Sequence, residues 1–298
     1  ITKKMATVSK KTIKGKEYYY FEHTVNEHGI PKKRSIYLGK EIPTDIEKRK
    51  QEFFHQLFKE KYRKNLDTVK ENFVEERKEV PESALEKELE YFMIKFTYDS
   101  NRIEGSTITL KETARLLEQG ITPKDKPLND AKESEAHKKV FYEMMEYKKD
   151  LNLSIVIHWH KMLLQETKPD ISGVIRKHLV KVAGSKTQFP LPIELDMLLR
   201  EFFIWYSKNK DKLYPVECAA LAHLKFVSIH PFTDGNGRMS RLIMNFILKR
   251  KGFPMLNIKY INRSAYYTAL ERSQTTNKEW IFVEHLIKRY LKEYKKYW

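Results

Sequence analysis

Helical periodicity from residue 81 to the end is the feature that most restricts the fold of this chain. Apolar residues recur there at spacings of three and four, which is the pattern of helices that bury one face. We expect one helix over 81–100 and eight more, at 109–119, 132–149, 154–167, 193–208, 215–229, 238–250, 264–274 and 279–297. The pattern therefore predicts a mainly α protein.

One stretch inside this region interrupts the helical pattern, and we expect a short β-hairpin there. Residues 179–182 and 187–189 are rich in strand formers and flank the turn 183–185. An exposed strand edge of this kind can hold another chain through backbone hydrogen bonds. We assign Val182, Gly184 and Phe189 to this flap.

The first 80 residues have a different character. Residues 18–21 and 35–38 are rich in strand formers, and the turn-forming run 26–29 lies between them. We expect a small basic β module over residues 1–42 and a charged helical linker over 43–80. The remainder, 81–298, forms the main helical region.

Composition excludes several classes of protein. Cys218 is the single cysteine, which excludes an intrachain disulfide and a thiolate zinc cluster, and we expect it in the core. No uninterrupted apolar run approaches ~18 residues, and the N-terminal stretch lacks the apolar centre of a secretory signal. We therefore expect a cytoplasmic protein with no membrane partner. The net charge of +17 is compatible with an acidic partner or with a well-solvated surface.

The segment 230–241, HPFTDGNGRMSR, concentrates the chemistry of the chain. Pro231 ends one helix, and the glycines on either side of Asn236 let backbone N–H groups converge on an anion. The helix that starts there adds free N–H groups and its positive dipole end. Arg238 and Arg241 share one face of that helix, and both can present a guanidinium fork to phosphate.

Two further residues of this segment complete a nucleotide site. Asp234 is its one carboxylate, and Mg²⁺ commonly takes one or two carboxylates together with substrate phosphates and water. His230 can act as a base near neutral pH. The segment therefore contains the parts of a Mg·nucleotide site with a general base.

This segment resembles the signature of the Fic family, H-x-F-x-[D/E]-G-N-G-R-x-x-R, at all eight specified positions. The resemblance covers about residues 90–275 and implies a Fic-type helical core over about 130–275, followed by a C-terminal helix. It also implies ATP and Mg²⁺ as cofactors and a protein substrate, including the enzyme itself. Gly237 resembles the branch that transfers AMP, since the branch that phosphorylates its target tends to have lysine there.

The resemblance implies specific roles for residues of this chain. His230 would be the base that deprotonates a Ser, Thr or Tyr hydroxyl of the target, and Asp234 would hold Mg²⁺. The implied nucleotide-binding residues are the turn, the two arginines and a tyrosine pair near the adenine: Gly235, Asn236, Gly237, Arg238, Arg241, Tyr266 and Tyr267. For the tyrosine pair, an ordinary place in an aromatic core stays open. We expect a structural ion pair for Arg176 and a core or surface position for His160.

The run 100–105, SNRIEG, resembles the inhibitory motif [S/T]-x-x-x-E-[G/N] of one Fic class. The resemblance implies that Ser100, Glu104 and Gly105 belong to an inhibitory helix over about 90–105. A carboxylate delivered to Arg241 would occupy the fork that the γ-phosphate needs. We therefore expect a protein adenylyltransferase that is inhibited in cis.

Two alternatives stay open. One is a Fic enzyme that acts mainly as a de-AMPylase or uses another nucleotide donor. The other is a nucleic-acid-binding regulator with a silent Fic core, because lysines and tyrosines interleave in the basic N-terminal module. A homo-oligomer is also left open.

Overall fold

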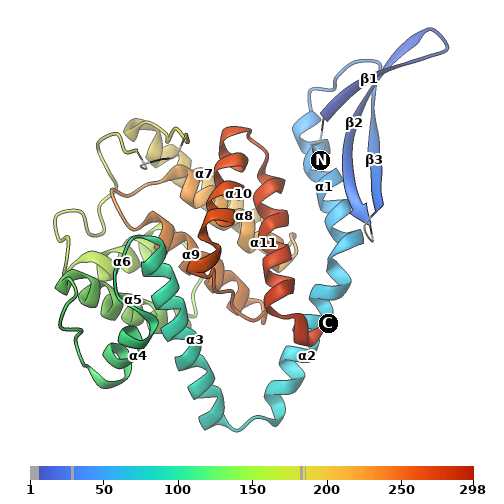
Figure 1. Cartoon of the computed structure of the whole chain (residues 1–298). Helices are drawn as coiled ribbons and strands as arrows, with labels where there is room; N and C mark the ends of the chain where they lie inside the picture. The colour runs from blue at the N-terminus through green and yellow to red at the C-terminus, as the bar shows by residue number, and fades with distance from the viewer. Residues whose placement is uncertain (1–6, 28–29, 182–183, 185) are drawn as a thin grey trace. The chain divides into compact units, whose positions relative to one another are not determined.

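A computed structural model describes residues 7–27, 30–181, 184 and 186–298 (Figure 1). The chain divides into two compact units, Ile1–Asn65 and Leu66–Trp298. The division falls within α2 (Arg63–Glu79).

Unit 1 is an antiparallel sheet followed by a helix. The strands β1 (Thr7–Ile13), β2 (Lys16–Glu27) and β3 (Ile30–Gly39) pair in the order β1-β2-β3, and α1 (Ile46–Lys61) follows. Strand β1 was not among the predicted strands, because the side chains on both of its faces are mostly polar. Its pairing with β2 is what identifies it as a strand. The two residues between β1 and β2, Lys14 and Gly15, both have positive φ, at 49° and 74°, as a type I′ turn requires.

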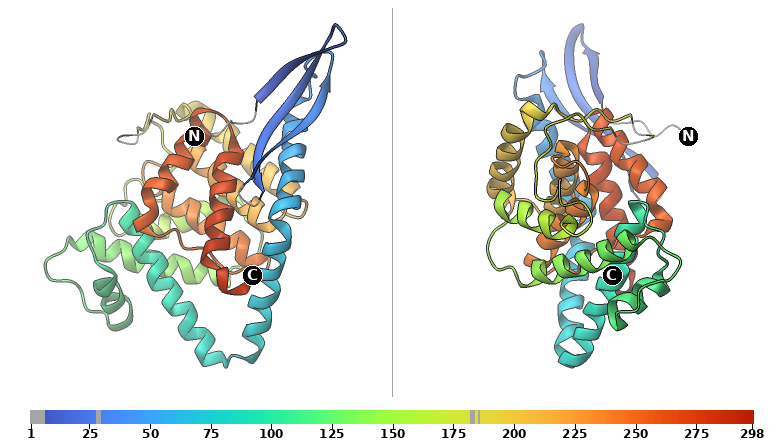
Figure 2. Two further views of the ribbon diagram at one scale, coloured as in Figure 1. Left: turned by 45° about the vertical axis from the view of Figure 1, so that its right-hand side comes forward. Right: turned by 90° about the vertical axis from the view of Figure 1, so that its left-hand side faces the viewer.

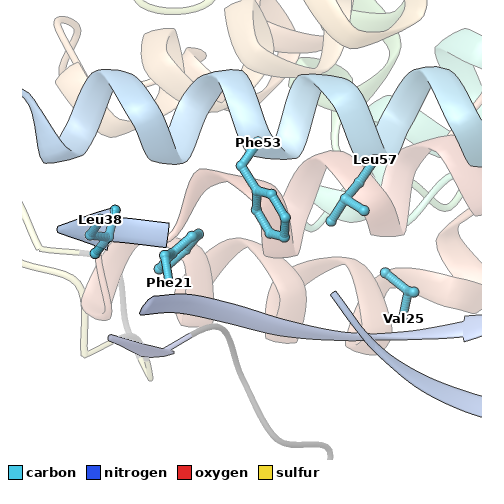
Figure 3. Close-up of a cluster of buried hydrophobic side chains, with 5 residues drawn as sticks. All are labelled: Phe21, Val25, Leu38, Phe53 and Leu57. Carbon is cyan, nitrogen blue, oxygen red and sulfur yellow. The ribbon is translucent and has the colours of Figure 1, made fainter. Parts of the chain in front are cut away.

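The core of unit 1 lies between the sheet and α1. Phe21, Val25 and Leu38 come from the sheet and meet Phe53 and Leu57 of α1 (Figure 3). Phe21 and Phe53 pack edge to face with their ring centroids 5.5 Å apart. Both views of Figure 2 show the strands running along one side of α1. One face of the sheet is therefore covered by α1.

Unit 2 is almost entirely helical, which confirms the predicted fold class. Its helices after α2 are α3 (Glu82–Ile103), α4 (Leu110–Gln119), α5 (Leu128–Glu146), α6 (Leu153–Leu164), α7 (Leu195–Asn209), α8 (Pro215–Ile229), α9 (Asn236–Arg250), α10 (Arg263–Thr275) and α11 (Glu279–Glu293). Three short 3₁₀ turns accompany them: Pro192–Glu194, Tyr260–Asn262 and Lys295–Tyr297. The predicted helix boundaries are within a few residues of these. Thr109 caps α4 through a reciprocal bond with Glu112.

The helix α9 is the centre of this unit. It contacts α3, α5, α6 and α8, and its side chains are buried on every side, including Met239, Leu242, Ile243 and Phe246. Cys218 lies buried in the neighbouring α8, where burial raises the pKa of its thiol to about 12, as expected for a core cysteine. No helix among the described residues is long and apolar enough to cross a bilayer.

The segment between α6 and α7 corrects one prediction. Its described residues form no strand, so the expected β-hairpin at 179–189 is not seen in them, and Val182 lies outside the described residues. A single bridge, Ile175 with Phe232, is the β-type pairing in this part of the described chain. Arg176 joins the two ends of this segment, because its guanidinium donates to the carbonyls of His178 and Pro190.

Candidate functional site

His230 stands at the point where α8 ends and the loop begins. It adopts a left-handed backbone conformation, with φ 51° and ψ 58°, which turns the chain out of the helix. Its Nδ1 lies 3.2 Å from the carbonyl oxygen of Val227. A carbonyl can only accept, so Nδ1 carries the proton and Nε2 presents a lone pair.

The environment of His230 keeps its imidazole neutral. Burial lowers the pKa of His230 to about 4, and the nearby positive charge of Arg176 acts in the same direction. The ring of Phe189 packs against the imidazole with centroids 4.0 Å apart. At neutral pH His230 is therefore a neutral ring that can accept a proton.

The loop itself is held by the side chain of Asn236. Its Oδ1 accepts the N–H of Phe232 at 2.9 Å, and its Nδ2 donates to the carbonyl of the same residue at 2.8 Å. The side-chain amide of Asn236 is therefore already bonded within the turn, and its backbone N–H is the group that could face an anion. Gly235, with φ 79°, makes the tight turn before α9.

His160 of α6 forms a platform beneath this loop. Its ring stacks on Phe232 with centroids 3.6 Å apart and an angle of 4° between the planes. The N–H of Gly173 donates to Nδ1 at 2.9 Å, so Nε2 carries the proton and donates to the carbonyl of Asp234, also at 2.9 Å. Burial lowers the pKa of His160 to about 4, which keeps this neutral tautomer at physiological pH.

Arg176 fastens the other side of the loop. It is 3% exposed and donates from Nε to the carbonyl of His230 at 2.8 Å, in addition to the carbonyls of His178 and Pro190. The expected ion pair is not found among the described residues. Arg176 instead ties the backbone of the 230–241 loop to the segment before α7.

Asp234 lies in a cluster of alternating charges. Its Oδ2 pairs with Lys168 at 2.5 Å, and its Oδ1 accepts the N–H of Gly235 and lies 3.5 Å from Arg238. Glu133 pairs with both Lys168 and Arg238. Burial alone would raise the pKa of Asp234, but Arg238 and Lys168 outweigh it and hold the pKa below its ordinary value.

The donor chemistry of this cluster suits Mg²⁺. The Asp234 carboxylate is ionised and its side chain is 33% exposed, so it could supply the one protein ligand that Mg²⁺ commonly takes when phosphates and water supply the rest. The described residues hold no group of three His, Cys, Asp or Glu placed as a complete metal cage. The ammonium of Lys168 lies against the same oxygen that a cation would need.

Arg241 is held by the C-terminal end of α3. Its guanidinium is 1% exposed and donates from Nε to Ser100 Oγ at 2.9 Å and from Nη2 to the Ser100 carbonyl at 3.0 Å. The same Nη2 pairs with Glu104 Oε1 at 2.6 Å. The pKa of Arg241 is raised because the Glu104 carboxylate outweighs the effect of burial.

Two glycines permit this arrangement. Gly105 has φ 106° and lets the chain leave α3 directly after Glu104. Gly237 lies directly beneath the carboxylate, and a Cβ at this position would clash with Glu104 Oε1. The absence of a side chain at Gly237 therefore makes room for Glu104 beside Arg241.

A cavity of about 300 Å³ joins these parts. Its walls include Glu104, His230, Gly237 and Arg241, and also Gly184, Phe189, Tyr266 and Tyr267. Tyr266 is buried and bonds His223 at 2.9 Å, whereas Tyr267 is half exposed and donates to the carbonyl of Ile103 at 3.0 Å. Tyr266 therefore has a core role as well as a place on the cavity wall.

A second, larger cleft of about 960 Å³ adjoins this cavity. It runs between residues 186–190, α7, α8 and α10, and Phe189 and Gln274 line both spaces. Gln274 bonds Ser228 Oγ and Thr187 Oγ1, each at 3.0 Å, so it closes the wall between them.

Most of the site residues expected from the sequence meet in one place. Asp234, Gly235, Asn236 and Arg238 lie on the loop and the start of α9 but do not line the 300 Å³ cavity. Sequence analysis missed Lys168, Glu133 and the supporting role of His160. No local motif marks them, because they come from α5, α6 and the turn after α6.

The sequence of this chain is similar to those of known proteins. Residues 150–248 match the model of the Fic/DOC family. Protein adenylyltransferase Fic of Nematostella vectensis is 36% identical over 181 residues, covering 59% of this chain and 42% of that protein. The Drosophila virilis protein of the same name is 35% identical over 193 residues, covering 63% of this chain and 39% of its own length. The chain thus spans about two fifths of the length of these relatives.

Solved structures show the same fold. A Fic domain containing signaling protein from Bacteroides thetaiotaomicron aligns with a TM-score of 0.66 at 27% identity, over 76% of this chain and 94% of that one. Fic-1 from C. elegans aligns with a TM-score of 0.68 at 26% identity, over 79% of this chain and 70% of that one.

Proposed function

Because the chain carries a domain of the Fic/DOC family, we propose that it is a protein adenylyltransferase that transfers AMP from ATP to a hydroxyl of a Ser, Thr or Tyr side chain. Relatives named protein adenylyltransferase Fic support this at the level of the family. The observation that carries the proposal is the 300 Å³ cavity, because it brings His230 and Arg241 to the walls of one pocket.

In the proposed reaction, the hydroxyl oxygen of the target attacks the α-phosphorus of ATP. The bond from that phosphorus to the bridging oxygen breaks, pyrophosphate leaves, and the hydroxyl proton passes to Nε2 of His230. A divalent cation held by Asp234 would neutralise phosphate charge when bound. The N–H groups at the start of α9 and the guanidinium group of Arg241 would bind phosphate oxygens, whereas Arg238 is buried, pairs with Glu133 and supports the loop.

Because burial lowers its pKa, His230 is neutral before the reaction begins and its Nε2 lone pair is free to accept a proton. Its Nδ1–H bond to Val227 fixes the tautomer, and Arg176 fixes the backbone of His230 itself. Removing His230 should lower the rate by about 10²- to 10⁴-fold, the usual effect of an ordinary general base.

We further propose that Glu104 inhibits the enzyme in cis. In the described arrangement Nη2 of Arg241 already donates to Glu104 and to the Ser100 carbonyl, and Nε donates to Ser100 Oγ. A γ-phosphate that needs the same fork would have to displace the carboxylate. Since the Arg241 side chain is 1% exposed, leaving its guanidinium without a partner is costly.

The proposed chemistry is tested by the position of the label in ATP. Incubating the Glu104→Gly protein with α-labelled and with γ-labelled ATP should label protein with the first and not with the second. Label from γ-labelled ATP would show phosphorylation instead. Labelling from α-labelled GTP or CTP, with none from α-labelled ATP, would show another donor.

The removal of AMP is tested separately. Labelled, adenylylated protein is purified and incubated with wild-type enzyme and with the Glu104→Gly variant. We expect little release in either case. Rapid release by the wild type alone would make Glu104 a residue that positions water and would favour de-AMPylation as the main activity.

A further inference from the structure

The face of the unit 1 sheet that α1 does not cover carries a charged and aromatic surface. Side chains alternate along a strand, so the residues next to the buried Phe21 point the other way. This outer face includes Lys11 on β1, Tyr18, Tyr20 and Glu22 on β2, and Lys33 and Tyr37 on β3. Lys11, Lys33 and Tyr37 are 42%, 58% and 53% exposed.

The charge of this sheet is strongly positive. Thr7–Gly39 contains seven Lys or Arg and three Glu, which gives 7 − 3 = +4. Glu22, the acidic residue on the outer face, is neutralised by ion pairs to both Lys11 and Lys33. These pairs lower the pKa of Glu22 to about 2 against the opposing effect of burial, so the cluster keeps one net positive charge at any physiological pH.

The β1–β2 turn adds a second basic feature. Lys14 and Lys16 sit at and beside the type I′ turn, and both are exposed. Neither has an ion-pair partner among the described residues. The hairpin tip extends past the end of α1 in both Figure 1 and Figure 2. A protruding tip with two unpaired lysines is well placed to contact phosphates.

We infer that this outer face and hairpin tip form a binding surface for double-stranded DNA, entered from the major groove. The distance between the outer strands of a three-stranded sheet is about 10 Å, which fits a major groove about 12 Å wide and exceeds a minor groove about 6 Å wide. The A-form major groove of double-stranded RNA is too narrow and deep for a sheet.

The aromatic residues favour a duplex over a single strand. Single-stranded nucleic acid needs open ring faces on which bases can stack. Here Tyr18 and Tyr20 tilt against Tyr37 at 55°, with centroids 6.0 and 5.4 Å away, and Lys11 lies 4.4 Å from the centre of the Tyr20 ring. The rings therefore pack on one another and present edges and hydroxyl groups, which suit base edges and phosphates in a groove.

The inference is independent of the proposed transferase activity, because no residue of the 230–241 loop takes part in it. It is tested with the full chain by fluorescence anisotropy on a labelled mixed-sequence duplex of about 20 base pairs, from about 50 to about 200 mM KCl. The same strand unpaired and a double-stranded RNA of the same sequence are measured in parallel. The duplex DNA should bind most tightly.

The decisive variant is Lys14→Ala/Lys16→Ala. Each lost phosphate contact removes about 0.9 from the slope of log Kd against log salt, so the slope should fall by about 1.8 and binding should weaken roughly 60-fold at about 0.1 M salt. Tyr37→Ala should weaken binding without changing the slope, because the tyrosine carries no charge. The matched control is Lys111→Ala/Lys208→Ala, which removes two exposed lysines from α4 and α7 of unit 2.

Three results would overturn the inference. The first is an equal loss of affinity in the matched control, which would show a diffuse charge effect. The second is tighter binding to the single strand or to the RNA duplex. The third is no binding of wild type at protein concentrations of about 10⁻⁴ M, the weak end of non-specific DNA affinities. Circular dichroism of each variant checks that unit 1 remains folded.

Discussion

Replacing His160 by phenylalanine should destabilise the loop that carries the candidate catalytic residues. The phenyl ring can keep the stacking on Phe232, but it cannot accept the N–H of Gly173 or donate to the carbonyl of Asp234. Both backbone groups would then lose their partner in a buried place. The substitution therefore isolates the hydrogen bonds from the ring contact.

The expected loss of stability follows from these two hydrogen bonds. Leaving a buried donor or acceptor unsatisfied costs about 1–3 kcal/mol, so His160→Phe should cost about 2–6 kcal/mol. For a domain of this size, 1 kcal/mol shifts the thermal midpoint by about 2–4 °C. Calorimetry should thus show a midpoint roughly 4–24 °C lower, and AMP transfer in a Glu104→Gly background should fall because the backbone of Asp234 is no longer held.

His158 offers a matched control two residues away. Its side chain is 53% exposed and pairs with Glu143 at 2.9 Å on the surface of α6. His158→Phe should change stability by less than about 0.5 kcal/mol. If His160→Phe and His158→Phe have the same midpoint, and both transfer AMP at the rate of the parent, the assigned role of His160 is wrong.

Three further predictions concern the charges of the site. Gly237→Ala should displace the Glu104 carboxylate, because the added Cβ would clash with it, and should raise self-labelling above the wild-type level. An unchanged level of self-labelling would contradict this prediction. Lys168→Met should lower the half-saturating Mg²⁺ concentration about two- to fivefold in the Glu104→Gly background, because it removes a half-exposed competing cation from Asp234. A higher half-saturating Mg²⁺ concentration in the variant would refute this. His137 and His223 have pKa values of about 3 through burial, whereas an unfolded histidine titrates near 6.5. Unfolded chains therefore bind protons that the native protein does not, and these two histidines together should lower the stability by about 3 kcal/mol from pH 6.5 to pH 5 in urea titrations.

Much of the fold could be predicted because helices are local. The apolar spacing in α8 and α9, the proline at the start of α8 and Thr109 at the start of α4 place these elements almost to the residue. Strand β1 could not be found in the same way. Its residues become a strand through their pairing with β2, and that partner is not encoded within β1.

The candidate site likewise contains residues that the sequence predicted and residues that it did not. His230 and Arg241 belong to one contiguous motif and line one cavity, whereas Asp234 of the same motif lies on the loop outside the cavity wall. Lys168 and His160 reach the loop from other elements, and only the packed structure shows their contacts. The interaction between Glu104 and Arg241 was expected from a short motif, and its 2.6 Å distance agrees with that expectation while leaving the inhibitory role to experiment.

The central claim is that His230 drives AMP transfer and that Glu104 restrains it. The most direct measurement is transfer of label from α-labelled ATP with Mg²⁺ to protein, compared for wild type, Glu104→Gly and Glu104→Gly/His230→Ala, with a cell lysate supplied as target. We predict weak labelling by wild type, strong labelling by Glu104→Gly, and a loss of about 10²- to 10⁴-fold in the double variant. No labelling by any of the three folded proteins, or equal labelling by wild type and Glu104→Gly, would contradict the account.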